Sequence, residues 1–183
     1  MEKILFFNII KFFTESPYQE IYLRQLAKKL KLSPFATKKY ADLLIQENLI
    51  LEERKANLRY FKANTQGLFY KHLKIALNIN KIEKSNLIKF IKEKVSNVSS
   101  IILFGSMARG EDEKNSDIDL VVIGKDKYLD LSKFEEILDK EINIHSFNWA
   151  EWNKQAKNNT AFYNDVISHG LPLYGELPII QWK

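Results

Sequence analysis

The stretch FGSMARGEDEKNSDIDLVV at residues 104–122 restricts the possible folds of this chain more than any other part of the sequence. An apolar strand-like run at residues 100–104 ends at Gly105-Ser106, ten residues follow, and Asp117-Ile118-Asp119 then opens a second such run that reaches residue 123. A helical pattern at 131–140 and a third strand-like run at 142–147 come next. Strands that alternate with helices indicate an α/β module. We therefore expect residues 97–183 to fold as an α/β domain with a small mixed sheet.

The residues around the first bend are suited to bind an anion. Gly105 has no Cβ, so a phosphate can approach its backbone closely. Ser106 adds a hydroxyl and a backbone N–H, and a short helix that begins there would direct further N–H groups toward the anion. Arg109 offers a charge-assisted contact, and Gly110 is a suitable end for the short helix. We expect Gly105, Ser106 and Arg109 to bind a nucleotide through its phosphates.

The acidic pair indicates a metal site. Asp117 and Asp119 are two residues apart on a strand, so both carboxylates project from the same face. A buried pair of like charges is unfavourable unless a cation neutralises it, and hard carboxylate oxygens suit Mg²⁺. In the alternative interpretation, Asp117 caps a turn and Asp119 is a solvated strand residue. The spacing from Gly105-Ser106 favours the metal site.

The combined pattern resembles the signature of the polymerase-β nucleotidyltransferase superfamily, and MARGE is similar to the continuation in its minimal, prokaryotic members. The resemblance covers about residues 98–175. It implies that Asp117 and Asp119 are catalytic metal ligands and that Mg²⁺, as two ions, and ATP or another nucleoside triphosphate bind here. It further implies transfer of a nucleoside monophosphate, AMP being the first candidate, to a hydroxyl acceptor such as a protein. Members of this kind often act with a small helical HEPN-type partner protein, and some are antitoxins that modify it.

Asn143 departs from the family pattern. Active members usually have a third carboxylate on a neighbouring strand, and the best-matching strand here is EINIHSF at 141–147. Asn143 cannot accept a proton at neutral pH. Glu141 is two residues earlier, hence on the same face, and is a further candidate metal ligand. Two functions stay open: a Mg-dependent nucleotidyltransferase, or a DNA-binding transcriptional regulator or antitoxin whose second domain senses nucleotide or is catalytically impaired.

Residues 1–66 have the order of elements of a winged helix, with helices followed by a β-hairpin wing. The helices predicted from apolar spacing are 2–14, 22–30 and 34–48. Ser33 is a suitable N-cap for the third, with Pro34 at its first position. Strand-like runs at 49–53 and 60–63 flank the polar segment 54–59 and predict a hairpin. The run LAKKLKLSPFATKKYADLLIQENLI resembles winged helix-turn-helix domains in its spacing.

Charge separates the two ends of the chain. Residues 1–96 hold 19 Lys and Arg against 9 Asp and Glu, whereas residues 97–183 hold 9 against 14. Residues 67–96 are helical in pattern and rich in lysine, which predicts a helical connector. A basic half suits a polyanion, although a lysine-rich solvated surface would have the same composition. The overall fold class that we expect is therefore α+β: a winged helix, a connector and a nucleotidyltransferase domain.

Double-stranded DNA is the polyanion that the winged-helix resemblance implies. The third helix of such a domain enters the major groove. The residues expected to contact DNA are Lys38 and Lys39 in that helix and Arg54, Lys55 and Arg59 in the wing. Some winged helices bind only proteins, so this fold does not by itself prove DNA binding. A homodimer is the usual expectation for such regulators.

The composition excludes several other kinds of site. The chain has no cysteine, so it has no disulfide framework or thiolate metal site. Its histidines, His72, His145 and His169, lack paired zinc spacing. No apolar run approaches the ~18 residues of a membrane span. We expect a cytoplasmic protein that does not associate with membranes.

Overall fold

The computed structural model describes residues 2–125 and 128–180. The chain divides into two compact units, Met1–Lys74 and Ile75–Lys183. Helices and small sheets occur in both units, which confirms the expected α+β class. Among the helices of the described residues, none combines the length and the apolar character needed to cross a membrane.

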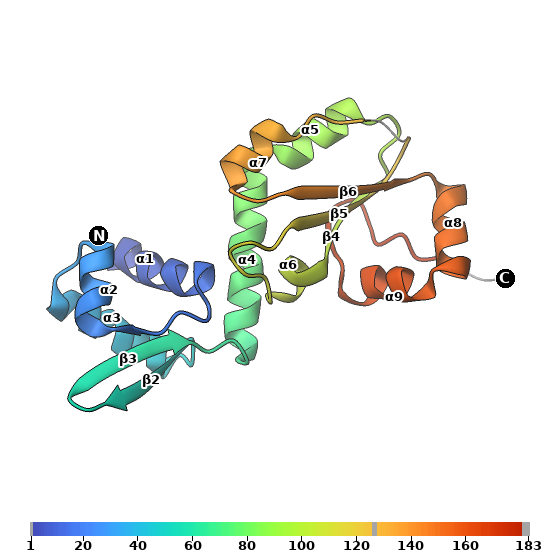
Figure 1. The fold of residues 1–183 in the computed structure, drawn as a ribbon. Coiled ribbons are helices and arrows are strands. Elements are labelled where there is room, and N and C mark those ends of the chain that lie inside the picture. Colours follow the sequence, from blue (N-terminus) through green and yellow to red (C-terminus); the bar gives the residue numbers. More distant parts are fainter. Residues whose placement is uncertain (1, 126–127, 181–183) are drawn as a thin grey trace. The chain divides into compact units, whose positions relative to one another are not determined.

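The first unit packs helices against a small antiparallel sheet (Figure 1). Its elements are α1 (Glu2–Glu15), β1 (Ile21–Tyr22), α2 (Leu23–Leu30), α3 (Pro34–Gln46), β2 (Ile50–Lys55) and β3 (Leu58–Ala63), and α4 (Leu68–Ser85) begins in this unit and ends in the second. Within the described residues, β3 lies between β1 and β2 in the sheet. β2 and β3 form a hairpin whose register pairs Lys55 with Leu58.

Local sequence explains where α3 begins. Lys31 has a left-handed φ of 54°, which ends α2. The Ser33 Oγ accepts a hydrogen bond from the Ala36 backbone N–H at 3.1 Å, and Pro34 occupies the first turn, where its missing N–H has no cost. The predicted cap is therefore confirmed, and it orients α3 so that Thr37 and Ala41 face the core.

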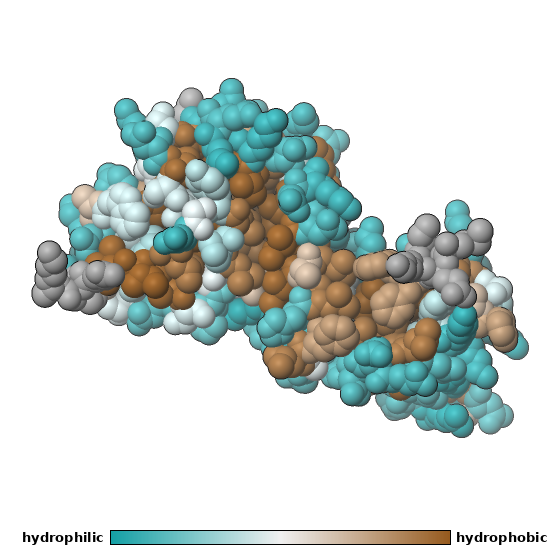
Figure 2. Space-filling view, turned by 180° about the vertical axis from the view of Figure 1, so that it is seen from behind, coloured by the Kyte–Doolittle hydropathy of each residue, from teal (hydrophilic) through white to brown (hydrophobic). Residues whose placement is uncertain are grey.

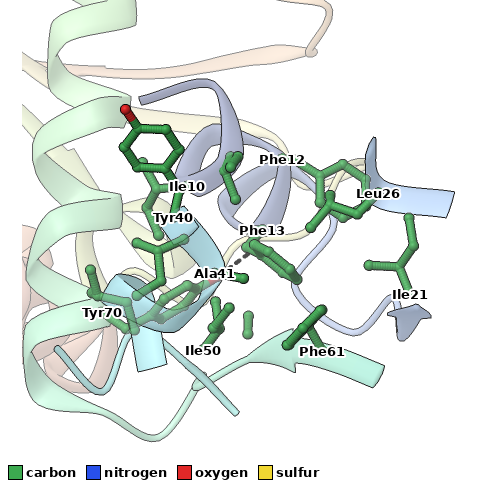
Figure 3. Packing of buried hydrophobic residues seen from close by; sticks show 14 residues of the cluster. Ile10, Phe12, Phe13, Ile21, Leu26, Tyr40, Ala41, Ile50, Phe61 and Tyr70 are labelled. Atoms are coloured by element: carbon green, nitrogen blue, oxygen red, sulfur yellow. Dashed lines mark hydrogen bonds between the residues drawn. The ribbon is translucent and has the colours of Figure 1, made fainter. Parts of the chain in front are cut away.

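The core of the first unit gathers side chains from its helices and its sheet (Figure 3). Phe13 of α1, Ala41 of α3 and Phe61 of β3 are fully buried in it. The Tyr70 hydroxyl donates a hydrogen bond to the Phe13 backbone carbonyl at 2.9 Å, the dashed line in Figure 3, so this buried polar group is satisfied. The first turns of α4 are thereby attached to α1.

The second unit is built on a mixed sheet (Figure 1). Its elements after α4 are α5 (Leu87–Lys94), β4 (Ser100–Phe104), α6 (Gly105–Arg109), β5 (Ile118–Ile123), α7 (Ser132–Leu138), β6 (Ile142–Phe147), α8 (Trp149–Asn158), α9 (Thr160–His169) and β7 (Leu171–Tyr174). Among the described residues the strand order is β6-β5-β4-β7. β5 is parallel to β6, whereas β4 is antiparallel to both β5 and β7.

Alternate residues of β5 supply two cores, one on each face of the sheet. Leu120 and Val122 pack with side chains of α4, α5 and α7. Val121 and Ile123 face the other way and pack with α8 and α9. Trp152 of α8 is fully buried on this face. Because a strand exposes successive side chains to opposite faces, a sheet covered by helices on both sides needs this continuous apolar run. Asp119 is two residues before Val121 on the strand, so its side chain lies on the same face of the sheet, the one covered by α8 and α9.

Several predicted boundaries were wrong. The hairpin strands extend to Lys55 and from Leu58, although the sequence predicted residues 54–59 as a connecting segment. This tip is solvated on both sides, so it lacks the apolar alternation that marks a strand. β1 and β7 were not predicted at all. Helix α7 is shorter than the predicted 131–140, because Asp139 has a left-handed φ of 53° that ends it.

Candidate active site

At the bend from β4 into α6, the backbone of Gly105 lies close to the carboxylate of Asp119. Gly105 has a φ of +72°, a conformation that L side chains rarely adopt. A Cβ at this position would lie only 2.6 Å from Asp119 Oδ2. Glycine therefore suits this position by its conformation, and any other residue would also have to displace the Asp119 carboxylate. At the other end of α6, Gly110 has a φ of +67°, as expected for a helix C-cap.

Asp117 and Asp119 lie at the start of β5, and both are half-buried. Asp119 pairs with Phe104 of β4 on one side and with Asn143 of β6 on the other. Asp117 precedes the strand, and the next N–H, that of Ile118, donates to the Glu141 carbonyl at 2.8 Å. The ends of β4, β5 and β6 therefore meet where the sequence analysis placed the bend and the acidic pair.

The Asn143 side chain joins the two acids. Its Nδ2 donates to Asp117 Oδ2 at 3.1 Å and to Asp119 Oδ1 at 3.2 Å. Both carboxylate oxygens therefore lie within 3.2 Å of one nitrogen atom, so they converge on a common point. Asn143 occupies the position beside the pair at which the resemblance led us to expect a carboxylate.

Glu141 does not complete the acidic group. It precedes the first residue of β6, and the strand register sets Asn143, not Glu141, opposite Asp119. Across residues 2–125 and 128–180, no three His, Asp or Glu side chains gather as metal ligands. The expectation that Glu141 supplies a third ligand therefore finds no support in this geometry.

Arg109 is held by acidic side chains. Its Nη1 donates to Asp165 Oδ1 of α9 at 3.1 Å, and its Nε donates to Glu111 Oε2 at 3.2 Å. Asp165 Oδ1 also lies 3.1 Å from Nδ1 of His169, one turn further along α9. The guanidinium expected to contact phosphate is therefore engaged by carboxylates of the protein. The i, i+4 spacing of Asp165 and His169 was a sequence signal for this cluster that the sequence analysis did not use.

Lys140 fixes the loop that leads into Asp117. Its ammonium donates to the backbone carbonyls of Glu113 at 2.8 Å, Lys114 at 3.2 Å and Ser116 at 2.7 Å. Within the same loop, the Glu113 N–H donates to Ser116 Oγ at 2.8 Å. Sequence reasoning missed Lys140, because no local motif connects it to a loop 24 residues away.

The beginning of that loop is attached to α4. Asn78 Nδ2 donates to Asp112 Oδ1 at 2.8 Å, and both side chains are buried. Asp112 was another residue that sequence reasoning missed. Together with Lys140, this contact holds the segment between Gly110 and Asp117 at both ends.

His145 lies beyond Asn143 on the same face of β6. Its ring centroid is 5.6 Å from that of Phe104 and 5.6 Å from that of Phe162. The ring is nevertheless exposed, so one surface of this aromatic group is open to a ligand.

The residues expected to contact DNA lie on two elements of the first unit. Lys38 and Lys39 are exposed on α3, with the Lys39 ammonium 5.6 Å from the centre of the Tyr40 ring. Arg54 and Lys55 are exposed near the tip of the hairpin, whose surface is mostly hydrophilic (Figure 2, lower right). Lys55 Nζ is paired with Glu20 at 2.5 Å, and Arg54 Nε lies 3.3 Å from Glu52.

Arg59 has a different environment from the other wing residues. Its Nη2 lies 2.5 Å from Asp42 of α3 and 2.7 Å from Glu52 of β2, and its side chain is only 21% exposed. The hydrogen bonds that Arg59 donates to Glu52, and then to Asp42, raise the pKa of Arg59, and its bond to Glu52 lowers the pKa of Glu52. Arg59 thus links α3 to the hairpin, and its guanidinium is not directed to solvent as a DNA contact would require.

A family model matches part of the second unit, and several known proteins match part of the chain. Residues 84–170 match the family model described as "Nucleotidyltransferase domain". A protein of Methanocaldococcus jannaschii, named as a candidate protein adenylyltransferase, is 37% identical over 78 residues, which are 39% of this chain and 81% of that protein. The protein adenylyltransferase MntA of Shewanella oneidensis is 23% identical over 103 residues, 53% of this chain and 68% of that protein.

Two solved structures also resemble part of the chain. A toxin–antitoxin crystal structure with AMP-PNP has a TM-score of 0.39 at 26% identity and covers 54% of this chain and 74% of its own. A mutant of the toxin–antitoxin MntA–HpeT has a TM-score of 0.38 at 23% identity, with coverage of 54% and 73%.

Proposed function

Because this chain belongs to the nucleotidyltransferase-domain family, we propose that it transfers AMP from ATP to a hydroxyl group of a protein. The proposal of a protein acceptor is supported by the names of the two relatives, both of which refer to protein adenylyltransferases. In this reaction the acceptor oxygen forms a bond to the α-phosphorus, the bond from that phosphorus to the bridging oxygen breaks, pyrophosphate leaves and the hydroxyl proton passes to water.

The observation that carries the proposal is the contact between Gly105 and Asp119. A backbone bend that could bind phosphate lies against a carboxylate that could bind metal, at a position where a Cβ would meet that carboxylate. A nucleotide bound at the bend would have its phosphates beside the acidic pair. Ser106 supports the same role, since its hydroxyl makes no hydrogen bond to any other described residue and can turn toward a phosphate.

The acidic pair fits a divalent cation. Oxygens of Asp117 and Asp119 converge on the Asn143 amide, and such hard oxygen donors suit Mg²⁺. The Asn143 amide can rotate and present its own carbonyl oxygen at the same point. We propose Asp117 and Asp119 as the ligands of Mg²⁺, with two ions as the resemblance implies. Bound there, Mg²⁺ would neutralise phosphate charge and lower the pKa of the attacking hydroxyl.

Arg109 and His145 are proposed to orient the nucleotide. Arg109 can exchange its bonds to Asp165 for bonds to a phosphate, which carries more charge than one carboxylate. The exposed ring of His145 can stack on the base, as aromatic surfaces next to nucleotide sites do. Asn143 limits the rate, since it cannot take the proton of the attacking hydroxyl.

Transfer of label tests the proposal. The full-length protein is incubated with ATP labelled at the α-phosphate, Mg²⁺ and candidate acceptors, among them the protein encoded by the neighbouring gene and any HEPN-type helical partner. We expect label to become covalently attached to one acceptor. Asp117→Ala and Asp119→Ala should each lower the rate by at least about 100-fold, as loss of an essential charged group does. Gly105→Ala should also abolish transfer, because its Cβ displaces Asp119.

Two further variants make the result specific. Glu136→Gln removes an exposed carboxylate of α7 and should leave transfer unchanged. Glu141→Gln should also retain transfer, because no third acidic side chain of the described residues gathers with the pair. Equal labelling by the wild type and the Asp117→Ala, Asp119→Ala double variant would overturn the proposal. ATP binding without transfer to any acceptor would favour a nucleotide sensor, the alternative that Asn143 supports.

We also propose that the first unit is a winged helix that binds double-stranded DNA as a homodimer, which would make the protein a regulator as well. The support is the element order α1, α2, α3 and a hairpin, together with a charge of 14 Lys and Arg against 7 Asp and Glu in residues 1–74. Lys38, Lys39 and Arg54 are the favoured contacts, because each side chain is exposed on α3 or the hairpin. Arg59 is assigned to holding these two elements together.

A further inference from the structure

Phe35 is an exposed aromatic residue in the first turn of α3. Its side chain is 80% exposed, although the other aromatic side chain of this helix, Tyr40, is only 5% exposed. A ring this exposed adds little to the stability of the unit itself. It lies in the first turn of α3, which begins at the Ser33 cap. The ring is thus accessible for a contact outside the unit.

The neighbours of Phe35 on the helix surface are basic. Lys38 and Lys39 follow it by three and four residues, so all three side chains lie on one face. Asp42, one turn further on, would repel a polyanion, but it is paired with Arg59 at 2.5 Å, which offsets part of its charge. The face of α3 that carries Phe35 is therefore apolar at its start, positive in the middle and only weakly negative at its end.

This combination fits the major groove of DNA. Lysines at the rim contact phosphates, whereas base edges are read by the side chains at the beginning of the inserted helix. A phenyl ring can neither donate nor accept a hydrogen bond to a base edge. The apolar group that a base pair presents in the major groove is the 5-methyl of thymine.

We infer that Phe35 determines sequence specificity by contacting the 5-methyl group of a thymine in the DNA site. This inference rests on the proposed DNA binding of the first unit. It assigns Lys38 and Lys39 to affinity and Phe35 to selectivity, and it requires a thymine at a fixed position of the preferred sequence.

Replacement of thymine by deoxyuracil isolates the methyl group. The full chain first selects duplexes from a randomised pool, and the preferred duplex is then prepared with each thymine replaced in turn by deoxyuracil, which keeps the base pair and removes the methyl. We expect one position at which the wild-type dissociation constant rises about fourfold, the factor for one buried methyl group. Phe35→Ala should bind the thymine duplex about fourfold more weakly than the wild type does, and it should not distinguish this duplex from the uracil duplex.

Matched variants identify the other outcomes. Phe7→Ala removes another exposed phenyl ring, from α1, and should keep the full thymine preference. Lys38→Ala should weaken binding to both duplexes equally. If Phe35→Ala keeps the wild-type preference, or if every uracil is tolerated by the wild type, the inference is wrong while DNA binding stands. Absence of duplex binding by the wild type would overturn the DNA-binding proposal and the inference together.

Discussion

At the scale of single residues, Asn143 differs in charge from the two acids that it touches, and this difference bears on the proposed metal site. Asn143 satisfies Asp117 and Asp119 with a neutral amide, where a carboxylate would add a third negative charge. The amide keeps the pair stable without a cation, but it leaves the site with fewer charges to attract one. An amide at position 143 thus favours the stability of the metal-free protein and disfavours tight metal binding.

Asn143→Asp is expected to reverse this balance. Three converging carboxylates repel one another, so the melting temperature in a chelator should fall by several degrees, and Mg²⁺ should raise it more than in the wild type. If the wild type transfers AMP, this variant should do so at least about tenfold faster, since a general base typically contributes more than that. Calorimetry with and without Mg²⁺ and the labelled-ATP assay measure both effects.

Asn143→Ala is the control for this variant, since it removes the amide without adding charge. A melting temperature of Asn143→Asp that does not respond to Mg²⁺ would show that position 143 is not part of a metal site.

At the scale of elements, Arg59 connects α3 to the hairpin by pairing with Asp42 and Glu52. Arg59→Met should lower the free energy of unfolding by about 1 kcal/mol at neutral pH, the upper end for partly exposed pairs. The pKa of Glu52 is lowered in the folded protein, chiefly by its hydrogen bond to Arg59. Its contribution is therefore complete above the ordinary glutamate pKa, and it is lost as the pH falls from about 4 through the lowered value.

Urea unfolding over a range of pH tests this link. The difference between wild type and Arg59→Met should shrink as the solution becomes more acidic than the Glu52 pKa. Arg54→Met is the matched control, because Arg54 contacts the same Glu52 but its side chain is 78% exposed. Its unfolding free energy should stay within about 0.5 kcal/mol of the wild type. An equal loss in both variants would argue against a special role for Arg59.

Local signals predicted most elements, and their limits are physical. Ser33 and Pro34 correctly indicated where α3 begins, and the apolar run at residues 118–123 correctly indicated β5. β1 could not be predicted, because its two residues are strand only through pairing with β3, 38 residues later at Tyr60.

In the candidate site, too, local features were predicted from the sequence and long-range contacts were not. Local spacing correctly predicted that Gly105, Asp117 and Asp119 lie at the ends of neighbouring strands, and their role in a site stays a prediction. The bond between Arg109 and Asp165, 56 residues apart, and the contacts of Lys140 depend on the packing of α9 and α7 against the sheet. No periodicity encodes such contacts. The expected nucleotidyltransferase domain was nevertheless confirmed, because its motif is local.

At the scale of the whole molecule, charge differs between the two units. Residues 1–74 carry 14 Lys and Arg against 7 Asp and Glu, whereas residues 75–183 carry 14 against 16. A polyanion should therefore bind through the first unit, and a nucleotide that brings its own cations suits the second. The winged-helix interpretation and DNA binding both stay predictions.

The salt dependence of duplex binding tests whether DNA binds through the first unit. The logarithm of the dissociation constant of a labelled random duplex should rise linearly with the logarithm of the salt concentration. Lys38→Ala and Lys39→Ala should each reduce the slope by about 1, as expected for loss of one phosphate contact. Lys89→Ala, which removes an exposed lysine of α5 in the second unit, should leave the slope unchanged. Equal effects of all three variants would indicate attraction by net charge alone.

The contact between Gly105 and Asp119 also restricts how this protein can diverge. A methyl group gained at position 105 meets the carboxylate at position 119, so the first change is tolerated only where the second has already shortened that side chain. Descendants of this chain should therefore not gain a side chain at position 105 while they keep Asp119. A lineage that abandons the chemistry would be recognised by the paired loss, even when its fold is intact.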